Sequence, residues 1–292
     1  MPIWEAILLG IVQGLTEFLP ISSTAHLIVL RQLLGHAHVE DAFTVVIQLG
    51  TLGAVVAYFR PDIVRIGNGL RADLRCRSLA STPDSRLGWL VVLGSVPAVV
   101  VGASLKGWLK RSFFNVPSVA VVSIIFALLM LAAEWWTRRR AARGRPPKGV
   151  TEIGWKEALW IGLWQAFALM PGGSRSGTTI TGGLFAGLSR PVAARFSFLL
   201  SLPVMLGAGL KELYDEYRKL RSPVVGEPPS LFASGEQVAA LLVGTLVSAV
   251  VGYLAIAFLI RFLRRYSTVA FVAYRLLLGG TILVLLATQV IA

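Results

Sequence analysis

The chain has 292 residues, of which 55% are hydrophobic and 15% are charged, and its mean hydropathy is +0.71. Several apolar runs are long enough to cross a bilayer, which excludes a soluble enzyme and predicts an all-α polytopic membrane protein. The formal net charge of +13 would suit a nucleic-acid partner if the basic residues formed one face. They lie instead in short segments between apolar runs, which is the positive-inside pattern, so we expect no nucleic-acid partner.

The first predicted element is a short apolar helix at residues 3–18. At ~1.5 Å per residue it reaches only about 24 Å, less than the ~30 Å of hydrocarbon in a bilayer. Pro20 breaks this helix, and the hydroxyl residues 22–24 favour the start of a second one that continues to Leu34. Two short helices with a polar tip between them describe a re-entrant loop. The tip should line a cavity, because lipid cannot satisfy the polar groups of irregular backbone.

Six later segments are apolar enough to be spanning helices, namely residues 41–59, 87–105, 116–136, 192–213, 237–263 and 269–291. A basic, turn-rich segment is expected directly after the first of them. Residues 155–188 repeat the opening pattern, with a short helix, a break at Pro171, a tip of small residues and another short helix. We therefore predict six spans and two re-entrant loops.

The two halves of the chain also resemble each other in sequence. The motif GxxQ begins at residues 10 and 162, each time ahead of a proline break, and the motif SxP begins at residues 95 and 201. We predict a single membrane domain, 1–292, with repeat 1 at about 1–137, a cytoplasmic linker at about 138–152 and repeat 2 at about 153–292. Each repeat holds one re-entrant loop and three spans. Because three is an odd number, the second repeat must be inverted relative to the first.

The distribution of basic residues predicts how the chain crosses the membrane. Segments 60–86, 137–156 and 261–268 fall on one side and carry most of the arginines and lysines, whereas 106–115 and 211–236 fall on the other side with fewer. The basic side should be cytoplasmic. The mouth of the first loop then faces outward, and the second loop enters from the cytoplasm.

Three ionisable residues are expected at membrane depth: Glu17, His26 and Arg175. An ionised side chain there costs about 2.5 to 3.5 kcal/mol on insertion scales, which favours a functional explanation. Two structural alternatives stand beside it. Glu17 and Arg175 could form a buried ion pair that ties the two tips together, and His26 could be a buried histidine whose ring nitrogens are satisfied by the protein.

A helix N-terminus follows each tip, and its free N–H groups and dipole favour an anion. Arg175 adds a planar guanidinium that suits phosphate. Further phosphate-binding candidates are the hydroxyl residues of the tips, Ser22, Ser23, Thr24, Ser174, Ser176 and Thr179. Gln13 and Glu17 share one helix face, where their oxygens could hold a hard divalent cation. His26 is the nearby imidazole that could act as base, acid or nucleophile.

Three motifs carry a resemblance to a known family: QxxxE at residues 13–17, PxSSTxH at 20–26 and PGxSRSGxT at 171–179. They resemble the signature of the undecaprenyl-diphosphate phosphatases, integral membrane proteins of the bacitracin-resistance type, along essentially the whole chain. The resemblance implies hydrolysis of undecaprenyl diphosphate to undecaprenyl phosphate, which recycles the lipid carrier for peptidoglycan and other envelope polymers. It also implies dependence on Mg²⁺ or Ca²⁺, bacitracin resistance, and a place in the bacterial inner membrane with the site open to the periplasmic side.

Carried over by position, the resemblance makes Glu17 a metal ligand or catalytic carboxylate and Arg175 the phosphate clamp. Ser23 and His26 become candidates for nucleophile or base, and water remains a third candidate nucleophile. Gln13 takes the amide option of the family pattern, so the metal would need water and substrate oxygens to complete its ligands. The expected partners are the polyprenyl diphosphate lipid and membrane lipids, with a homodimer as a further candidate. The alternative function is a transporter or flippase for a polyprenyl phosphate or a small anion.

Overall fold

The computed structural model describes residues 1–35, 42–222 and 230–289, and these ranges contain helices and turns but no β-strand. Five helices are long and apolar enough to cross a membrane: α5 (Pro83–Phe113), α6 (Val116–Ala142), α9 (Arg190–Arg221), α10 (Gly235–Leu263) and α11 (Val269–Ala287). Helices α3 (Ala42–Tyr58) and α4 (Arg60–Cys76) pass the same test only as a pair, bent by 80°. The described part of the chain therefore holds five or six candidate spans, and the prediction of a polytopic helical membrane protein is confirmed.

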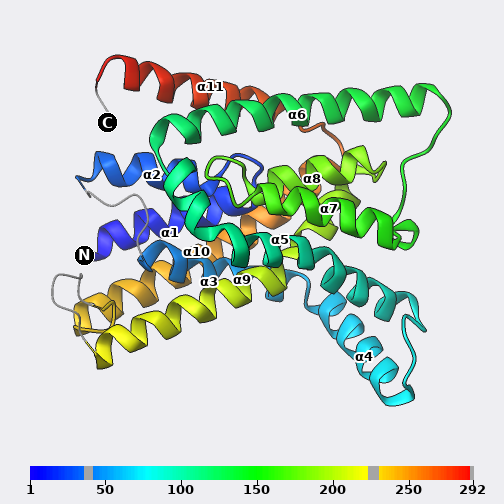
Figure 1. Cartoon of the computed structure of the whole chain (residues 1–292), viewed down its shortest axis with the longest axis horizontal. Helices are drawn as coiled ribbons and strands as arrows, with labels where there is room; N and C mark the ends of the chain where they lie inside the picture. The colour runs from blue at the N-terminus through cyan, green and yellow to red at the C-terminus, as the bar shows by residue number, and fades with distance from the viewer. Residues whose placement is uncertain (36–41, 223–229, 290–292) are drawn as a thin grey trace.

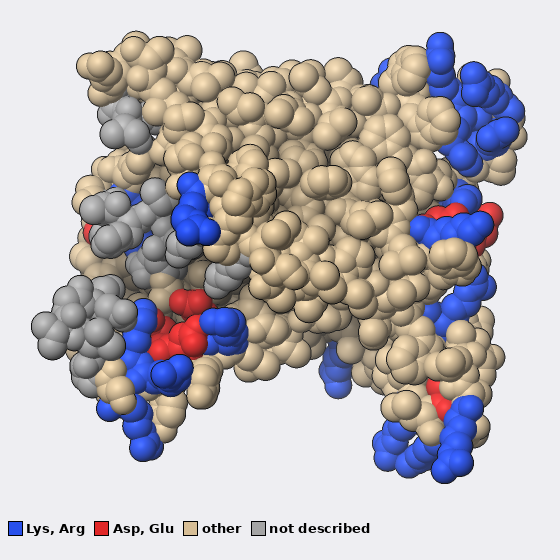
Figure 2. Space-filling view, viewed as in Figure 1, with Lys and Arg blue, Asp and Glu red and all other residues tan. Residues whose placement is uncertain are grey.

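The long helices run side by side along the long axis of the molecule, and the short ones end near its middle (Figure 1). Charged side chains gather mostly toward the two ends of the molecule, with a largely uncharged band between them (Figure 2). Such a band is what a lipid-facing surface requires, because charged groups are costly in hydrocarbon. The short helices therefore end at the depth of the lipid.

Two pairs of short helices occupy the predicted loop positions: α1 (Ile3–Phe18) with α2 (Ser23–Leu33), and α7 (Trp155–Phe167) with α8 (Arg175–Phe185). Helix α1 ends because Leu19 turns to an extended conformation just before Pro20. Helix α2 begins after Ser22, whose side chain accepts a hydrogen bond from the Ala25 backbone at 3.3 Å. Both predicted breaks are therefore present.

Residues 60–76, predicted to be turn-rich, form helix α4 instead. Pro61 stands in its first turn, where the missing N–H costs nothing. Ile66 and Leu70 lie within about 3 Å of where a Cβ on Gly88 of α5 would stand, so the helix has an apolar face that packs on α5. The prediction was wrong because the arginines of this segment occupy the opposite face of an amphipathic helix.

The short helices pack closely against spanning helices of the other half of the chain. Helix α1 lies along α10, where a Cβ on Gly10 would stand 2.6 Å from the Gly244 carbonyl oxygen. Helix α7 lies along α5, where a Cβ on Gly162 would stand 2.2 Å from the Gly94 carbonyl oxygen. Both contacts require glycine, because a real Cβ does not come this close to backbone. These crossings fix the depth at which each loop tip lies.

Candidate active site at the loop tips

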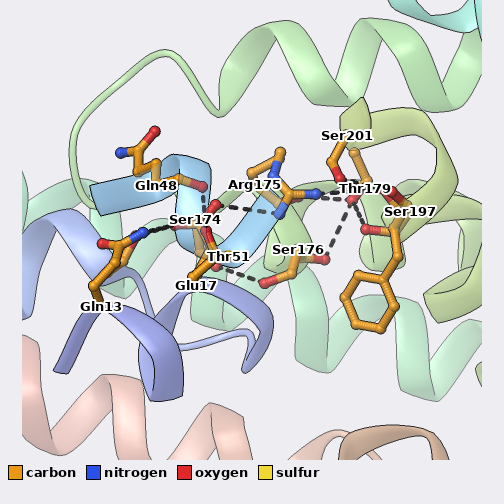
Figure 3. Close-up of polar contacts among 12 residues, drawn as sticks. Gln13, Glu17, Gln48, Thr51, Ser174, Arg175, Ser176, Thr179, Ser197 and Ser201 are labelled. Atoms are coloured by element: carbon orange, nitrogen blue, oxygen red, sulfur yellow. Dashed lines mark hydrogen bonds and ion pairs between the residues drawn. The ribbon is translucent and has the colours of Figure 1, made fainter. Parts of the chain in front are cut away.

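The two loop tips meet through an ion pair between Glu17, at the end of α1, and Arg175, at the start of α8 (Figure 3). The Arg175 Nη2 atom donates to Glu17 Oε1 at 3.2 Å, and Nη1 donates to the Ser197 carbonyl oxygen at 3.4 Å. The side chains are only 12% and 8% exposed, so both charges are largely removed from solvent. The buried ion pair considered from sequence is thus present, and it joins residues 158 positions apart.

Glu17 also organises the first tip through its second oxygen. Oε2 accepts hydrogen bonds from Gln13 Nε2 at 3.1 Å and from the Ser23 hydroxyl at 2.8 Å. The spacing of Gln13 and Glu17 on one helix face allows the first of these bonds. The carboxylate is therefore the partner of the Ser23 hydroxyl and is placed to take its proton.

The hydroxyls of the second tip have partners within the protein. Ser174 accepts from the Gly177 backbone at 3.1 Å, which caps α8 in the same way that Ser22 caps α2. The Ser176 hydroxyl donates to the Leu19 carbonyl oxygen of the first tip at 3.1 Å. In this structure these serines support the tip, and a contact of theirs with phosphate stays a prediction.

Thr179 and Thr24 occupy different surroundings. Thr179 is fully buried, and its hydroxyl lies 2.7 Å from the Arg175 carbonyl oxygen and 2.5 Å from the Ser197 hydroxyl. Thr24 lies half-buried in the first turn of α2. The structure thus brings Glu17, Ser23 and Arg175 into one connected group, while Thr179 stands behind that group as a support for the α8 backbone.

His26 faces away from this group, toward α11. Its Nδ1 lies 2.7 Å from the Ser22 carbonyl oxygen and its Nε2 lies 2.6 Å from the Tyr274 hydroxyl. The imidazole and the Tyr274 ring are stacked, with centroids 5.6 Å apart and an angle of 8° between their planes. The Ser23 hydroxyl therefore bonds to Glu17, and His26 bonds to Tyr274.

Arg275 was not among the predicted site residues. Its side chain is fully buried, and Nη2 and Nη1 donate to the Gly172 and Gly173 carbonyl oxygens at 2.7 and 3.1 Å. It therefore holds the second tip from behind. The signal in the sequence was an arginine inside an otherwise apolar span, which is costly enough to need an explanation.

The model of the family described as "Bacitracin resistance protein BacA" matches residues 6–281, which is nearly the whole chain. The chain belongs to the BacA family.

Curated relatives of this BacA-family chain are similar along their full length. The chain is 48% identical over 288 residues to the undecaprenyl-diphosphatase of Prosthecochloris aestuarii, covering 99% of this chain and 98% of the relative. It is 47% identical over 287 residues to the protein of the same name from Chlorobium phaeobacteroides, and 46% over 287 residues to that of Chloroherpeton thalassium. In both cases the match covers 98% of each chain. The family resemblance seen in the three motifs is confirmed.

Two buried atoms at the centre of the site have no hydrogen-bond partner among the described residues of this BacA-family chain. They are the Gln13 Oε1 acceptor and the Arg175 Nε donor. Leaving buried polar atoms unpaired is costly, so each is suited to a group that arrives from outside. An open donor on a guanidinium suits a phosphate oxygen, and an open amide oxygen suits a hard cation.

The oxygen atoms present fit a divalent cation that takes most of its ligands from elsewhere. Within residues 1–35, 42–222 and 230–289 there is no cluster of three or more His, Cys, Asp or Glu side chains that could hold a metal ion. Gln13 Oε1 and the Glu17 carboxylate are the two groups available at the tip. Mg²⁺ commonly uses one or two protein oxygens and completes its shell with water and phosphate oxygens, so this small donor set is sufficient.

Proposed function

We propose that this chain hydrolyses undecaprenyl diphosphate to undecaprenyl phosphate and inorganic phosphate. Membership of the BacA family and the name shared by its relatives support this substrate. The observation that carries the proposal is the connected group of the Ser23 hydroxyl, the Glu17 carboxylate and the Arg175 guanidinium at the N-terminus of α8. The reaction would recycle the lipid carrier for peptidoglycan synthesis and thereby confer bacitracin resistance.

Of the three nucleophiles left open by the sequence, the geometry favours Ser23. In the first step its oxygen attacks the terminal phosphorus, the proton passes to Glu17 Oε2, and the bond to the bridging oxygen breaks, so that undecaprenyl phosphate leaves. In the second step water attacks the phosphorus of the phosphoserine and the bond to the Ser23 oxygen breaks. Glu17 Oε2 returns its proton to that oxygen, which restores the Ser23 hydroxyl, and inorganic phosphate leaves. Arg175 and the N-terminus of α8 stabilise the charge on the transferred phosphoryl group in both steps. His26 is the candidate base for the attacking water, although in this structure its Nε2 is turned toward Tyr274 and not toward Ser23.

The cation expected for this reaction, Mg²⁺ or Ca²⁺, would be held by Gln13 Oε1 and Glu17 together with water and substrate oxygens. When bound, it would neutralise negative charge on the diphosphate. Gln13 then has two roles that do not conflict, because its Nε2 donates to Glu17 while its Oε1 is open.

We infer that the two halves are inverted repeats and that the protein lies in the bacterial inner membrane with its site open to the periplasmic side. Ser22 and Ser174 support the repeat, since both are N-caps with a positive φ, 74° and 65°, and each precedes a helix of 11 residues. The crossings of α1 with α10 and of α7 with α5 support it further. Since α1 of the first repeat corresponds to α7 of the second, these crossings make α10 the counterpart of α5. The SxP motif, in contrast, aligns α5 with α9. A homodimer stays a prediction that light scattering in detergent would check.

The experiment that tests the function is phosphate release from undecaprenyl diphosphate by the purified protein, with Mg²⁺ and with chelator. We expect metal-dependent release in the wild type, and a loss of at least about 100-fold in Glu17→Gln, which lacks the proton acceptor. Ser23→Ala should lose the phosphoserine that rapid quenching traps in the wild type. Ser112→Ala, which removes an exposed hydroxyl in the last turn of α5, is the matched control and should behave as wild type.

Two outcomes would overturn parts of this proposal. Wild-type protein that binds the lipid and releases no phosphate would favour the transporter or flippase alternative. A fully active Ser23→Ala variant would exclude Ser23 as the nucleophile and leave His26 or water.

A further inference from the structure

The environment of His26 fixes which of its ring nitrogens carries hydrogen. Nδ1 lies 2.7 Å from the Ser22 carbonyl oxygen, and a carbonyl oxygen can only accept. Nδ1 must therefore be protonated, which leaves the lone pair of the neutral imidazole on Nε2. Nε2 lies 2.6 Å from the Tyr274 hydroxyl, so the tyrosine donates to it. Any proton that His26 gains or loses during turnover is exchanged at Nε2, beside the Tyr274 hydroxyl.

Tyr274 is itself held in place by a contact of its own ring and by the contacts of its neighbour on α11. Its ring stacks on the imidazole. Its neighbour Arg275 is fully buried and donates from three nitrogen atoms to backbone carbonyl oxygens, those of Gly172 and Gly173 in the second tip and that of Ser123 in α6. One dipeptide of α11 thus contacts both loop tips, the tyrosine at the first and the arginine at the second.

We propose that Tyr274 is the positioning residue for His26 in the reaction, an inference that rests on the proposed hydrolysis. A tyrosine hydroxyl can donate to the neutral Nε2 and accept from the protonated Nε2–H, so it holds the imidazole in one orientation in both states. Among the residues that the structure describes, the other charged groups near this end of α2 are Glu17 on α1, which pairs with Arg175 on α8, and Arg275 on α11. Tyr274 is the uncharged group that contacts the exchanging nitrogen directly.

The test compares Tyr274→Phe with Tyr266→Phe. The first variant keeps the stacked ring and removes only the hydroxyl. The second removes the hydroxyl of an exposed tyrosine whose ring packs on Phe262, away from His26. For Tyr274→Phe we expect kcat to fall about tenfold, equal to ~1.4 kcal/mol, with KM within about twofold of wild type. The limb of the pH–rate profile that reports His26 should also move by at least about half a pH unit, since the group bound to the titrating nitrogen has changed. Tyr266→Phe should change none of these.

A second readout does not depend on activity. In ¹⁵N-histidine-labelled protein in lipid nanodiscs, with signals assigned from a His26→Gln sample, Tyr274→Phe should shift the Nε2 resonance of His26 and leave Nδ1 in place. An unchanged Nε2 resonance overturns the proposal. So does a loss of activity that follows a loss of thermal stability while the pH–rate profile stays where it was. If the wild type released no phosphate, the proposed hydrolysis would fail, and the Nε2 resonance would still decide whether Tyr274 positions His26.

Discussion

From the sequence, Glu17 could be a catalytic or metal-binding carboxylate, or half of a structural ion pair. The contacts of its side chain are compatible with both roles at once. Its carboxylate accepts from Gln13, Ser23 and Arg175, which lie on three different helices. A buried ion pair is not by itself evidence of stability, because desolvation offsets much of the attraction between the charges. What the pair does here is to hold a serine hydroxyl and a guanidinium at one point in the membrane. The same contacts that join the tips therefore also assemble the groups that we propose to be reactive.

Arg175→Lys tests whether the guanidinium acts as a clamp or only as a counter-charge. A lysine retains the charge opposite Glu17, but it cannot hold Glu17 and a phosphate oxygen in the fixed geometry of a planar fork. We expect kcat/KM for phosphate release to fall more than tenfold, which corresponds to more than about 1.4 kcal/mol. Arg195→Lys is the control, because Arg195 pairs with Asp62 rather than with the site. A similarly small loss in both variants would refute the clamp.

The sequence revealed the residues of the site that stand out against apolar surroundings, and it missed those whose role depends on a neighbouring helix. Glu17, His26 and Arg175 are recognisable because an ionisable group at membrane depth is costly. Tyr274 is unremarkable near the start of an apolar span, since tyrosine is common where membrane helices meet the interface. Its contact with His26 joins residues 248 positions apart, and no local pattern predicts which helix lies beside a loop tip.

At the scale of helices, the two breaks share a feature that proline alone does not explain. Pro20 and Pro171 follow the ends of α1 at Phe18 and of α7 at Phe167. The chain reverses only after them, at Ser22 and Ser174, whose φ angles are 74° and 65°. Residues with a side chain rarely adopt this conformation, and such strain concentrates at functional sites. Serine combines a small side chain with a capping hydroxyl, which makes it suitable at both tips.

Gly162→Ala tests whether the crossing of α7 with α5 fixes the second loop. A Cβ there would stand 2.2 Å from the Gly94 carbonyl oxygen, so the helices must separate. We expect a loss of about 1 to 3 kcal/mol, seen as a lower melting temperature in a fixed detergent. Gly280→Ala is the matched control within α11, because a Cβ there meets nothing within 4 Å. It should be neutral or stabilising by up to about 1 kcal/mol. Equal shifts in the two variants would contradict the close crossing.

Helix α4 is the element that average hydropathy failed to predict. The positions of the apolar spans follow from hydropathy, because a long run without charges can hardly be anything else in a membrane protein. A short amphipathic helix lying beside a span is polar on average, and its helical character appears only in the spacing of residues such as Ile63 and Ile66, which pack against the core. Its arginines had been assigned to turns for that reason.

At the scale of the whole molecule, the charge distribution and the inverted repeat together predict which end of the molecule faces the cytoplasm. The basic ends of α4 and α6 lie at the same end of the molecule, at the right of Figures 1 and 2. The link from α5 to α6 lies toward the opposite end, at the left of Figure 1. If the basic end is cytoplasmic, the first loop opens outward, which is where a phosphatase acting on the periplasmic side needs its site. A measurement of which end faces the cytoplasm therefore also tests whether the proposed site opens to the periplasmic side.

The orientation of the chain in the membrane can be measured by labelling Cys76, because it is the one cysteine of the sequence and lies exposed at the end of α4. We expect a membrane-impermeant maleimide to label Cys76 in inverted vesicles and not in intact spheroplasts. In a Cys76→Ser background, Ser112→Cys places the thiol at an exposed position in the last turn of α5, beside the link to α6, and the labelling should reverse. The pair is internally controlled, since each variant must react from one side. Labelling of Cys76 from outside would invert the topology and place the mouth of the Glu17 loop in the cytoplasm, and a periplasmic reaction would then require the substrate to reach the second loop instead.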